Sequence, residues 1–277
     1  MVFQALLASI FSGAEILIIK SGFARMKLHS EHFATLYFLA NVLVMVPFSF
    51  FFFNPDIEML KLSNLVLLAG LVICATIYNL SNFKGYKYVT VQKAEPIMLS
   101  SWIFSIIFAF LFYPEERDII NIILAAIAFI ALFFSFSSSY KVILDKGSSF
   151  LLIGSVFVGL HSLFVKELVG LYGAFPLYFI RAVFVLLILL PILRPPKALF
   201  KPRSMIYFIG FSVLVVIENI FLYWSYDVNG IILTSLFMTL APIVGLWGSI
   251  IFLKEKLHIK NVLITLIIIS CIVISLL

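Results

Sequence analysis

Charged residues are scarce in this sequence: they make up 12% of its 277 residues, whereas hydrophobic residues make up 64%. An ordinary soluble domain has about 25% charged and about 45 to 50% apolar residues. Polar helix faces are missing as well, which excludes a soluble helical bundle. The apolar runs are continuous rather than alternating, which excludes a transmembrane β-barrel. The composition therefore predicts an all-α integral membrane protein.

Cysteines and catalytic motifs are also few. Cys74 and Cys271 each stand alone in an apolar run, and lone buried cysteines usually act as small hydrophobic residues. No HExxH, CxxC, GxSxG or phosphate-binding glycine loop is present, so nothing indicates an enzyme or a cofactor. The HSEH stretch at 29–32 is interpreted as polar loop sequence rather than as a metal site. The net charge of +6 needs no nucleic acid, because loop lysines near anionic lipid explain it.

Ten apolar stretches dominate what remains. A helix needs roughly 20 residues to cross the hydrocarbon core. The first stretch lacks a basic region before it and is interpreted as a retained helix, not a cleaved leader. The predicted transmembrane helices cover residues 3–24, 33–53, 62–83, 91–112, 119–138, 149–169, 175–194, 205–224, 231–253 and 259–277.

An internal repeat relates the two halves of the chain. At an offset of 140, YNLSNFKGYKYV overlies ENIFLYWSYDVN and pairs Asn79 with Asn219. At an offset of 146, SGAEILIIKS overlies VGLHSLFVKE and pairs Glu15 with His161. Each half then contains five helices, and an odd number makes the second half enter the membrane from the opposite side. We therefore expect two inverted five-helix repeats.

The predicted repeats cover residues 1–140 and 147–277. Basic residues support the helix count, because fourteen of the nineteen lie in the loops after the odd-numbered helices and three in the other loops. The rule that basic loops stay in the cytoplasm would place both termini outside.

The end of the chain, TSLFMTLAPIVGLWGSIIFLKEKLHIKNVLITLIIISCIVISLL at 234–277, carries a family resemblance, with Pro242 in the ninth helix and Glu255 at its exit. A weaker copy lies at 94–138, in which Trp102 stands at the position of that proline. Together with the repeat, these segments resemble the EamA-like ten-helix branch of the drug/metabolite transporter superfamily.

This resemblance implies an alternating-access carrier whose central cavity is lined by helices 1 to 4 and 6 to 9. Helices 5 and 10 would be peripheral. It also implies that both termini are cytoplasmic, which conflicts with the distribution of basic residues, so the orientation stays open.

Ionisable groups inside the predicted helices are the main candidates for a functional site, because each costs about 2.5 to 3.5 kcal/mol at a helix centre even on the lenient insertion scale. Carboxylates in a hydrated cavity would bind an amine or carry a proton, and an arginine would hold a carboxylate. The alternative is that Arg181 pairs with a glutamate for packing alone. The candidate substrate or coupling residues are Glu15, Asn41, Tyr78, Asn79, Trp102, His161, Arg181, Glu218 and Asn219.

Small residues in the ninth helix are candidates for close packing or for a hinge. Ala241, Gly245 and Ser249 fall on one face, and Pro242 interrupts the hydrogen-bond ladder. Lys20 and Lys166 are repeat mates near helix ends, where we expect their long side chains to snorkel to the interface.

The sequence thus predicts a multi-pass protein of the cell membrane, either plasma or inner. We expect a secondary transporter for a small metabolite, such as an amino acid or amine, with protons as one coupling option. The alternative is a flippase for a lipid-linked sugar or another amphipathic molecule. The expected partners are that small molecule and the bilayer, and the chain is expected to be a monomer or a homodimer.

Overall fold

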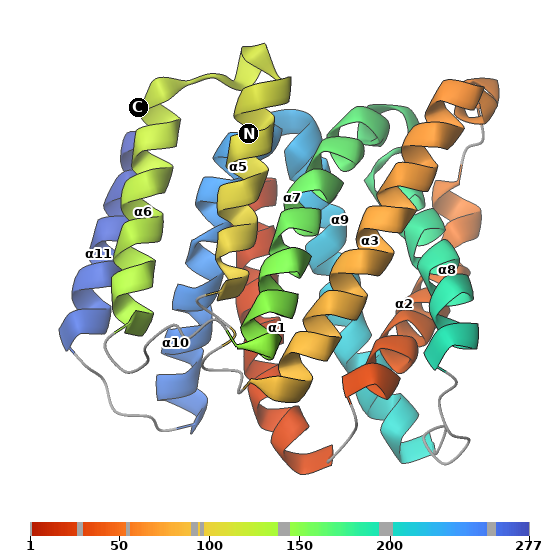
Figure 1. The fold of residues 1–277 in the computed structure, drawn as a ribbon, viewed down its shortest axis with the longest axis horizontal. Helices are drawn as coiled ribbons and strands as arrows, with labels where there is room; N and C mark the ends of the chain where they lie inside the picture. The colour runs from red at the N-terminus through yellow and green to blue at the C-terminus, as the bar shows by residue number, and fades with distance from the viewer. Residues whose placement is uncertain are drawn as a thin grey trace.

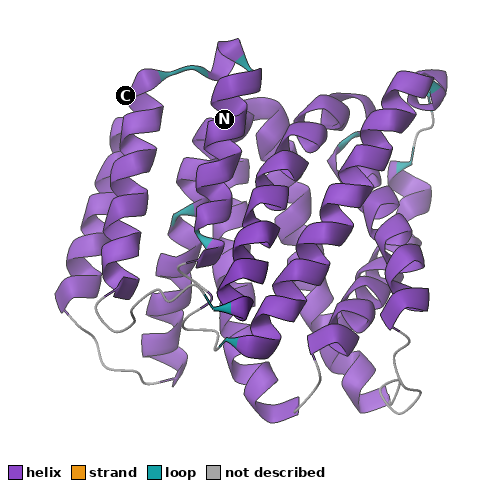
Figure 2. Cartoon of the chain, in the orientation of Figure 1, coloured by secondary structure: helices purple, strands orange, loops and turns teal. Residues whose placement is uncertain are grey.

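The structure is a computed structural model that describes residues 2–26, 30–53, 56–89, 94, 97–137, 145–193, 202–253 and 259–276. Every regular element in these residues is helical (Figure 2). The α-helices are α1 (Phe3–Met26), α2 (Ser30–Phe52), α3 (Leu62–Tyr88), α5 (Ser100–Phe112), α6 (Ile119–Ser137), α7 (Lys146–Tyr172), α8 (Ala174–Leu193), α9 (Pro202–Met238), α10 (Leu240–Leu253) and α11 (Ile259–Ile274), with 3-10 turns η1 (Ile57–Leu60) and η2 (Pro114–Glu116).

The ten α-helices of the described residues confirm the predicted all-helical, ten-helix fold. The eighth and ninth predicted helices are joined in α9, but Gly230, with φ 79° and ψ 174°, divides them. Gly230 can hold this positive φ because it has no Cβ. Glu255, which carries part of the family resemblance, lies outside the described residues.

The fourth helix of each half is interrupted at corresponding positions. Around Leu99 and Thr239, which are related by the offset of 140, the Trp102 N–H donates to the Leu99 carbonyl and the Thr239 N–H to the Leu236 carbonyl. These bonds span three residues rather than the four of an α-helix. For this reason α5 and α10 are short, and the ninth predicted helix consists of residues 231–238 and α10.

The bundle has an apolar surface suited to lipid. Among the described residues, five helical segments are both long and apolar enough to cross a bilayer, and four shorter apolar helices accompany them. Large side chains such as Phe50 and Phe51 are 85% and 83% exposed. Soluble proteins rarely expose contiguous apolar patches of this kind. The chain is a multi-pass membrane protein. The five long segments are Ala34–Phe52, Leu62–Tyr88, Lys146–Tyr172, Ala174–Leu193 and Met205–Met238.

The helix contacts follow the two-fold symmetry of an inverted repeat. In Figure 1, α1 runs away from the end of the bundle where both termini lie, and α7 runs towards it. Helix α1 packs against α9 and α10, and its counterpart α7 packs against α3 and α5. Helices α2 and α8 contact each other across the halves, as do α6 and α11. Each half therefore completes its core with the first helix of the other half.

Two glycines related by the repeat allow these close contacts. A Cβ on Gly13 in α1 would lie 2.5 Å from the Val244 Cβ, and a Cβ on Gly159 in α7 would lie 2.8 Å from the Phe104 Cβ. Gly13 and Gly159 are separated by 146 residues, and Phe104 and Val244 by 140. The same pair of offsets found in the sequence therefore recurs in the packing.

Candidate functional site

A central cavity of about 350 Å³ lies among eight helices. Its lining comes from α1, α2, α3, α5, α7, α8, α9 and α10, together with residues 98 and 99, which precede α5. These are the helices that the family resemblance implied. None of the described residues that line the cavity belongs to α6 or α11, which lie together at one edge of the bundle (Figure 1).

Most of the residues singled out in the sequence meet at this cavity. Both interruptions of the fourth helices also border it, through Leu99 and Trp102 on one side and Ala241 and Pro242 on the other. Because discontinuous helices often form binding sites in transporters with inverted repeats, this position is a plain candidate for substrate. The predicted residues that line the cavity are Glu15, Tyr78, Asn79, Trp102, His161, Arg181, Glu218, Asn219 and Pro242.

The two acidic residues form a pair. Glu15 on α1 and Glu218 on α9 have side chains within hydrogen-bonding reach of each other, and Ser12 also reaches Glu218. An ionised carboxylate only accepts hydrogen bonds, so a bond between two carboxyl groups requires a proton on one of them. Both side chains line the cavity, and the pair is therefore positioned to exchange that proton or to meet a cation.

Arg181 on α8 lies in an aromatic cage and is only 1% exposed. Its Cζ lies 4.5 Å from the ring centroid of Tyr178 and 5.5 Å from that of Tyr223. Its Nη1 donates to the Tyr78 hydroxyl at 3.3 Å and lies 3.0 Å from His161 Nε2. Rings of this kind attract a guanidinium through their negative faces. The packing partner that the sequence suggested was a glutamate, whereas the hydrogen-bond partners described are Tyr78 and His161.

These contacts determine the state of His161. Arginine has no acceptor, so His161 Nε2 must accept from Arg181 and carry no proton. The Tyr223 hydroxyl oxygen lies 3.1 Å from the same nitrogen. A neutral imidazole with its proton on Nδ1 has one lone pair on Nε2, which faces both Arg181 and Tyr223. The histidine therefore orients the arginine and a tyrosine beside the cavity.

Two predicted residues do not line the cavity. Asn41 on α2 is fully buried and donates from Nδ2 to the Tyr178 hydroxyl at 3.1 Å, which ties α2 to α8. Gly245 is buried in α10 away from the lining.

Pro242 lies in the first turn of α10, where its missing N–H would have had no partner within α10. The acceptor that an N–H at this position would have in a continuous helix is the carbonyl of Met238, where α9 ends, so Pro242 coincides with the interruption of the ninth predicted helix.

Sequence reasoning missed several lining residues, among them three tyrosines. The repeat itself carried the signal, because residues at corresponding positions of the two halves both border the cavity. Tyr86 and Tyr226 are one such pair, and Asn82 and Leu222 are another. The residues missed include Ser12, Tyr37, Asn82, Phe83, Tyr86, Leu222 and Tyr226.

Of the two lysine repeat mates, Lys166 has a described side chain. Lys166 forms an ion pair with Glu116, with Nζ and Oε1 2.8 Å apart, and its side chain is 20% exposed. The sequence did not indicate that Lys166 would pair with Glu116. The side chain of Lys20 lies outside the described residues.

No cluster of three or more potential metal ligands occurs in the part of the chain that the structure describes. The chemical resources of the cavity are therefore the acid pair, the caged arginine, amide groups and aromatic rings. Such a set suits the binding of a small molecule rather than a covalent reaction.

Comparisons with known proteins agree with this arrangement. No curated protein matches the sequence. Among the solved structures that match, one crystal structure is similar with a TM-score of 0.77 and 11% identity, over 98% of this chain and 96% of that one. The model of the EamA-like transporter family matches residues 1–137 and again residues 145–277. Since the two matches cover both five-helix halves, the chain belongs to the EamA-like transporter family.

Proposed function

We propose that this protein is a secondary transporter that moves a small amine-bearing metabolite, amino acids included, across the cell membrane. The observation that carries the proposal is the Glu15–Glu218 pair at the cavity. A substrate ammonium would displace the shared proton and neutralise the negative charge that this leaves on the pair. Binding of either the proton or the substrate would then bias the two states of an inverted-repeat carrier.

The rest of the lining supports a substrate with an apolar body. Aromatic side chains such as Tyr37, Phe83 and Trp102 surround the acid pair. The charge of Arg181 is already shared with two tyrosine rings and a histidine, and only 1% of the residue is exposed. A substrate carboxylate would therefore be a weaker determinant of binding than a substrate amine.

The flippase alternative receives less support. A phosphate headgroup favours a site with more cations than anions, whereas this cavity has two carboxyl groups and one guanidinium that is caged. A headgroup of that kind would meet the acid pair at a cost in electrostatic energy. The carrier for a soluble metabolite is the better fit.

Counterflow in proteoliposomes tests the proposal. Purified protein should exchange a radiolabelled amine or amino acid, selected first by a thermal-shift screen against amino acids, amines, nucleosides and sugar phosphates. Glu218→Gln should reduce counterflow to the background of empty liposomes, because an amide neither holds the shared proton nor neutralises an ammonium. The matched control is Glu115→Gln, which alters an exposed glutamate in η2. Full activity of a folded Glu218→Gln protein would remove the acid pair from the mechanism.

A further inference from the structure

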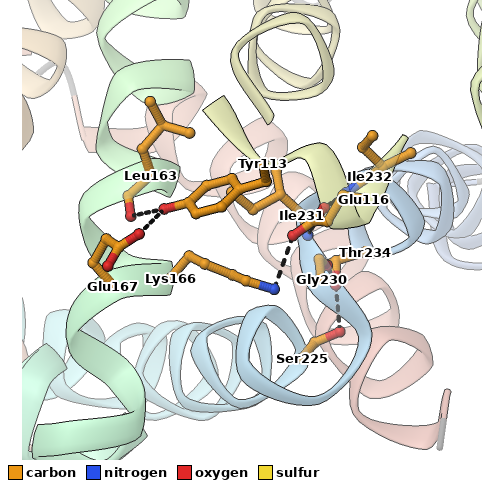
Figure 3. Close-up of polar contacts among 10 residues, drawn as sticks. All are labelled: Tyr113, Glu116, Leu163, Lys166, Glu167, Ser225, Gly230, Ile231, Ile232 and Thr234. Atoms are coloured by element: carbon orange, nitrogen blue, oxygen red, sulfur yellow. Dashed lines mark hydrogen bonds and ion pairs between the residues drawn. The ribbon is translucent and has the colours of Figure 1, made fainter. Parts of the chain in front are cut away.

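A second polar cluster lies at the end of the bundle where both termini lie, here called the terminal end. Glu116 in η2, from the first half, reaches the N-terminus of residues 231–238, from the second half (Figure 3). Its Oε2 accepts from the N–H groups of Ile231 at 2.7 Å and Ile232 at 2.9 Å. Its other oxygen, Oε1, lies 2.8 Å from Lys166 Nζ on α7. One carboxylate thus joins three segments from both halves.

Gly230 makes this contact possible. Its positive φ interrupts α9 and leaves the next N–H groups without helical partners, and Glu116 supplies the acceptors. A Cβ at this position would lie 2.8 Å from the Glu116 Cδ. The negative carboxylate also complements the positive end of the helix dipole. The segment that carries the break is therefore matched to one side chain from the other half.

The surroundings shield the cluster from water. The side chains of Glu116 and Lys166 are 9% and 20% exposed. Tyr113 lies under Lys166, whose Nζ is 5.7 Å from its ring centroid. The Tyr113 hydroxyl donates to Glu167 Oε1 at 2.8 Å and lies 3.1 Å from the Leu163 carbonyl oxygen. Burial and the bond to Glu167 raise the pKa of Tyr113, so it remains a donor at physiological pH.

The cluster lies beyond one end of the cavity. Tyr226 borders the cavity, and Gly230 follows it by about one helical turn. Between them and the terminal end, buried apolar residues such as Ile106, Val165 and Ile231 fill the bundle. At the other end the lining continues to Tyr86, in the last turn of α3. The cavity is therefore sealed on the side of the cluster.

We propose that Glu116 and Lys166 form a latch that holds the terminal end closed. Opening this end requires η2, α7 and residues 231–238 to separate, and the carboxylate carried by η2 is bonded to both of the other segments. Breaking the latch exposes two helix N–H groups and a lysine to water, which can solvate them. The latch therefore acts on the balance between the two states rather than on substrate contacts. Its role as a gate rests on the proposed transport function, whereas the contacts that form it do not.

Cysteine accessibility tests the latch without any knowledge of the substrate. Ser12→Cys places a thiol on the cavity lining, in a background in which Cys74 and Cys271 are replaced by alanine. A membrane-impermeant maleimide is added to vesicles from the terminal end. Glu116→Ala should raise the labelling rate about tenfold, because charged hydrogen bonds are among the stronger ones. Glu115→Ala, which removes an exposed neighbouring charge in η2, should leave the rate unchanged.

Two further variants separate the parts of the latch. Lys166→Met removes the ion pair but keeps the acceptor for Ile231 and Ile232, and Glu116→Gln keeps a neutral acceptor. Both should label at rates between the parent and Glu116→Ala. These two variants also carry the test if Glu116→Ala does not fold. Labelling equal to the parent in the folded variants would overturn the latch.

The outcome is independent of the counterflow test. If labelling depends on the latch but no counterflow is seen, the latch is supported and the proposed transport is contradicted. If counterflow depends on Glu218 but labelling does not change in the Glu116 and Lys166 variants, the transport is supported and the latch is contradicted.

Discussion

Arg181 is among the largest fully buried side chains of the described residues, and it lies within a membrane-spanning helix. It persists there because Tyr178 and Tyr223 pack against the guanidinium while Tyr78 and His161 take hydrogen bonds from it. A buried charge without such partners would be strongly unfavourable. The cage therefore makes Arg181 a structural centre of the cavity wall.

Replacing this arginine should destabilise the protein. Arg181→Ala leaves a void and deprives Tyr78 and His161 of a partner, so we expect a loss of about 2–5 kcal/mol in the free energy of unfolding. Thermal unfolding in detergent, followed by tryptophan fluorescence, measures it. Arg117→Ala, at an exposed position, should change stability by about 1 kcal/mol or less. Equal melting temperatures for the two variants would contradict the role assigned to the cage.

At the scale of elements, the close approach of first and fourth helices from opposite halves is the feature on which the cavity wall depends. Gly159 on α7 lies against the backbone of Phe104 on α5. Gly13 on α1 lies against α10, where an added Cβ on Gly13 would be 2.7 Å from the carbonyl oxygen of Ala241. The interrupted fourth helices are therefore held against helices that carry cavity residues such as Glu15 and His161.

A methyl group at this contact should separate the helices. Gly159→Ala would place a Cβ 2.8 Å from the Phe104 carbonyl carbon, and such overpacking costs about 1–3 kcal/mol. We expect a lower melting temperature and weaker ligand-induced stabilisation. The control is Gly210→Ala in α9, where an added Cβ meets nothing within 4 Å. That change should be neutral or stabilising, because alanine is the better helix former. A tolerated Gly159→Ala would show that α5 and α7 have room to spare.

For the whole molecule, the inverted symmetry places matching elements at opposite ends. The described residues of the terminal end include η1, η2 and Gly230, whereas α7 begins at the other end (Figure 1). The described residues Lys84, Lys87 and Lys146 lie at that other end. The sequence places most of the basic residues in the loops after the odd-numbered helices, which predicts that the two ends differ in charge although the helices are related by a two-fold axis.

Sidedness can be read from two exposed lysines. Lys61 follows η1 at the terminal end, and Lys146 begins α7 at the opposite end. Lys61→Cys and Lys146→Cys, in the cysteine-free background, should react with an impermeant maleimide from opposite sides of the membrane. The side on which Lys146→Cys reacts decides between the positive-inside rule and the orientation that the family resemblance implied. Labelling of both from one side would contradict the ten-helix threading.

Sequence alone was sufficient for features that depend on composition and local order. The ten apolar runs, the repeat offsets of 140 and 146, and the family resemblance are all readable in the chain. So are the ionisable residues Glu15, His161, Arg181 and Glu218, because a charge within an apolar helix stands out whatever its neighbours are. These properties belong to single residues or to regular spacing along one helix.

Tertiary structure decided which side chains meet. Glu15 pairs with Glu218 and Arg181 with tyrosines because α1, α8 and α9 approach in three dimensions, which no spacing along the chain specifies. In the same way Glu115 and Glu116 are adjacent and identical in the sequence, but Glu116 is the residue that reaches Ile231 and Lys166. Contacts between distant segments depend on helix rotation and on the turn that presents each side chain, and a shift of one residue along such a turn changes the partner entirely.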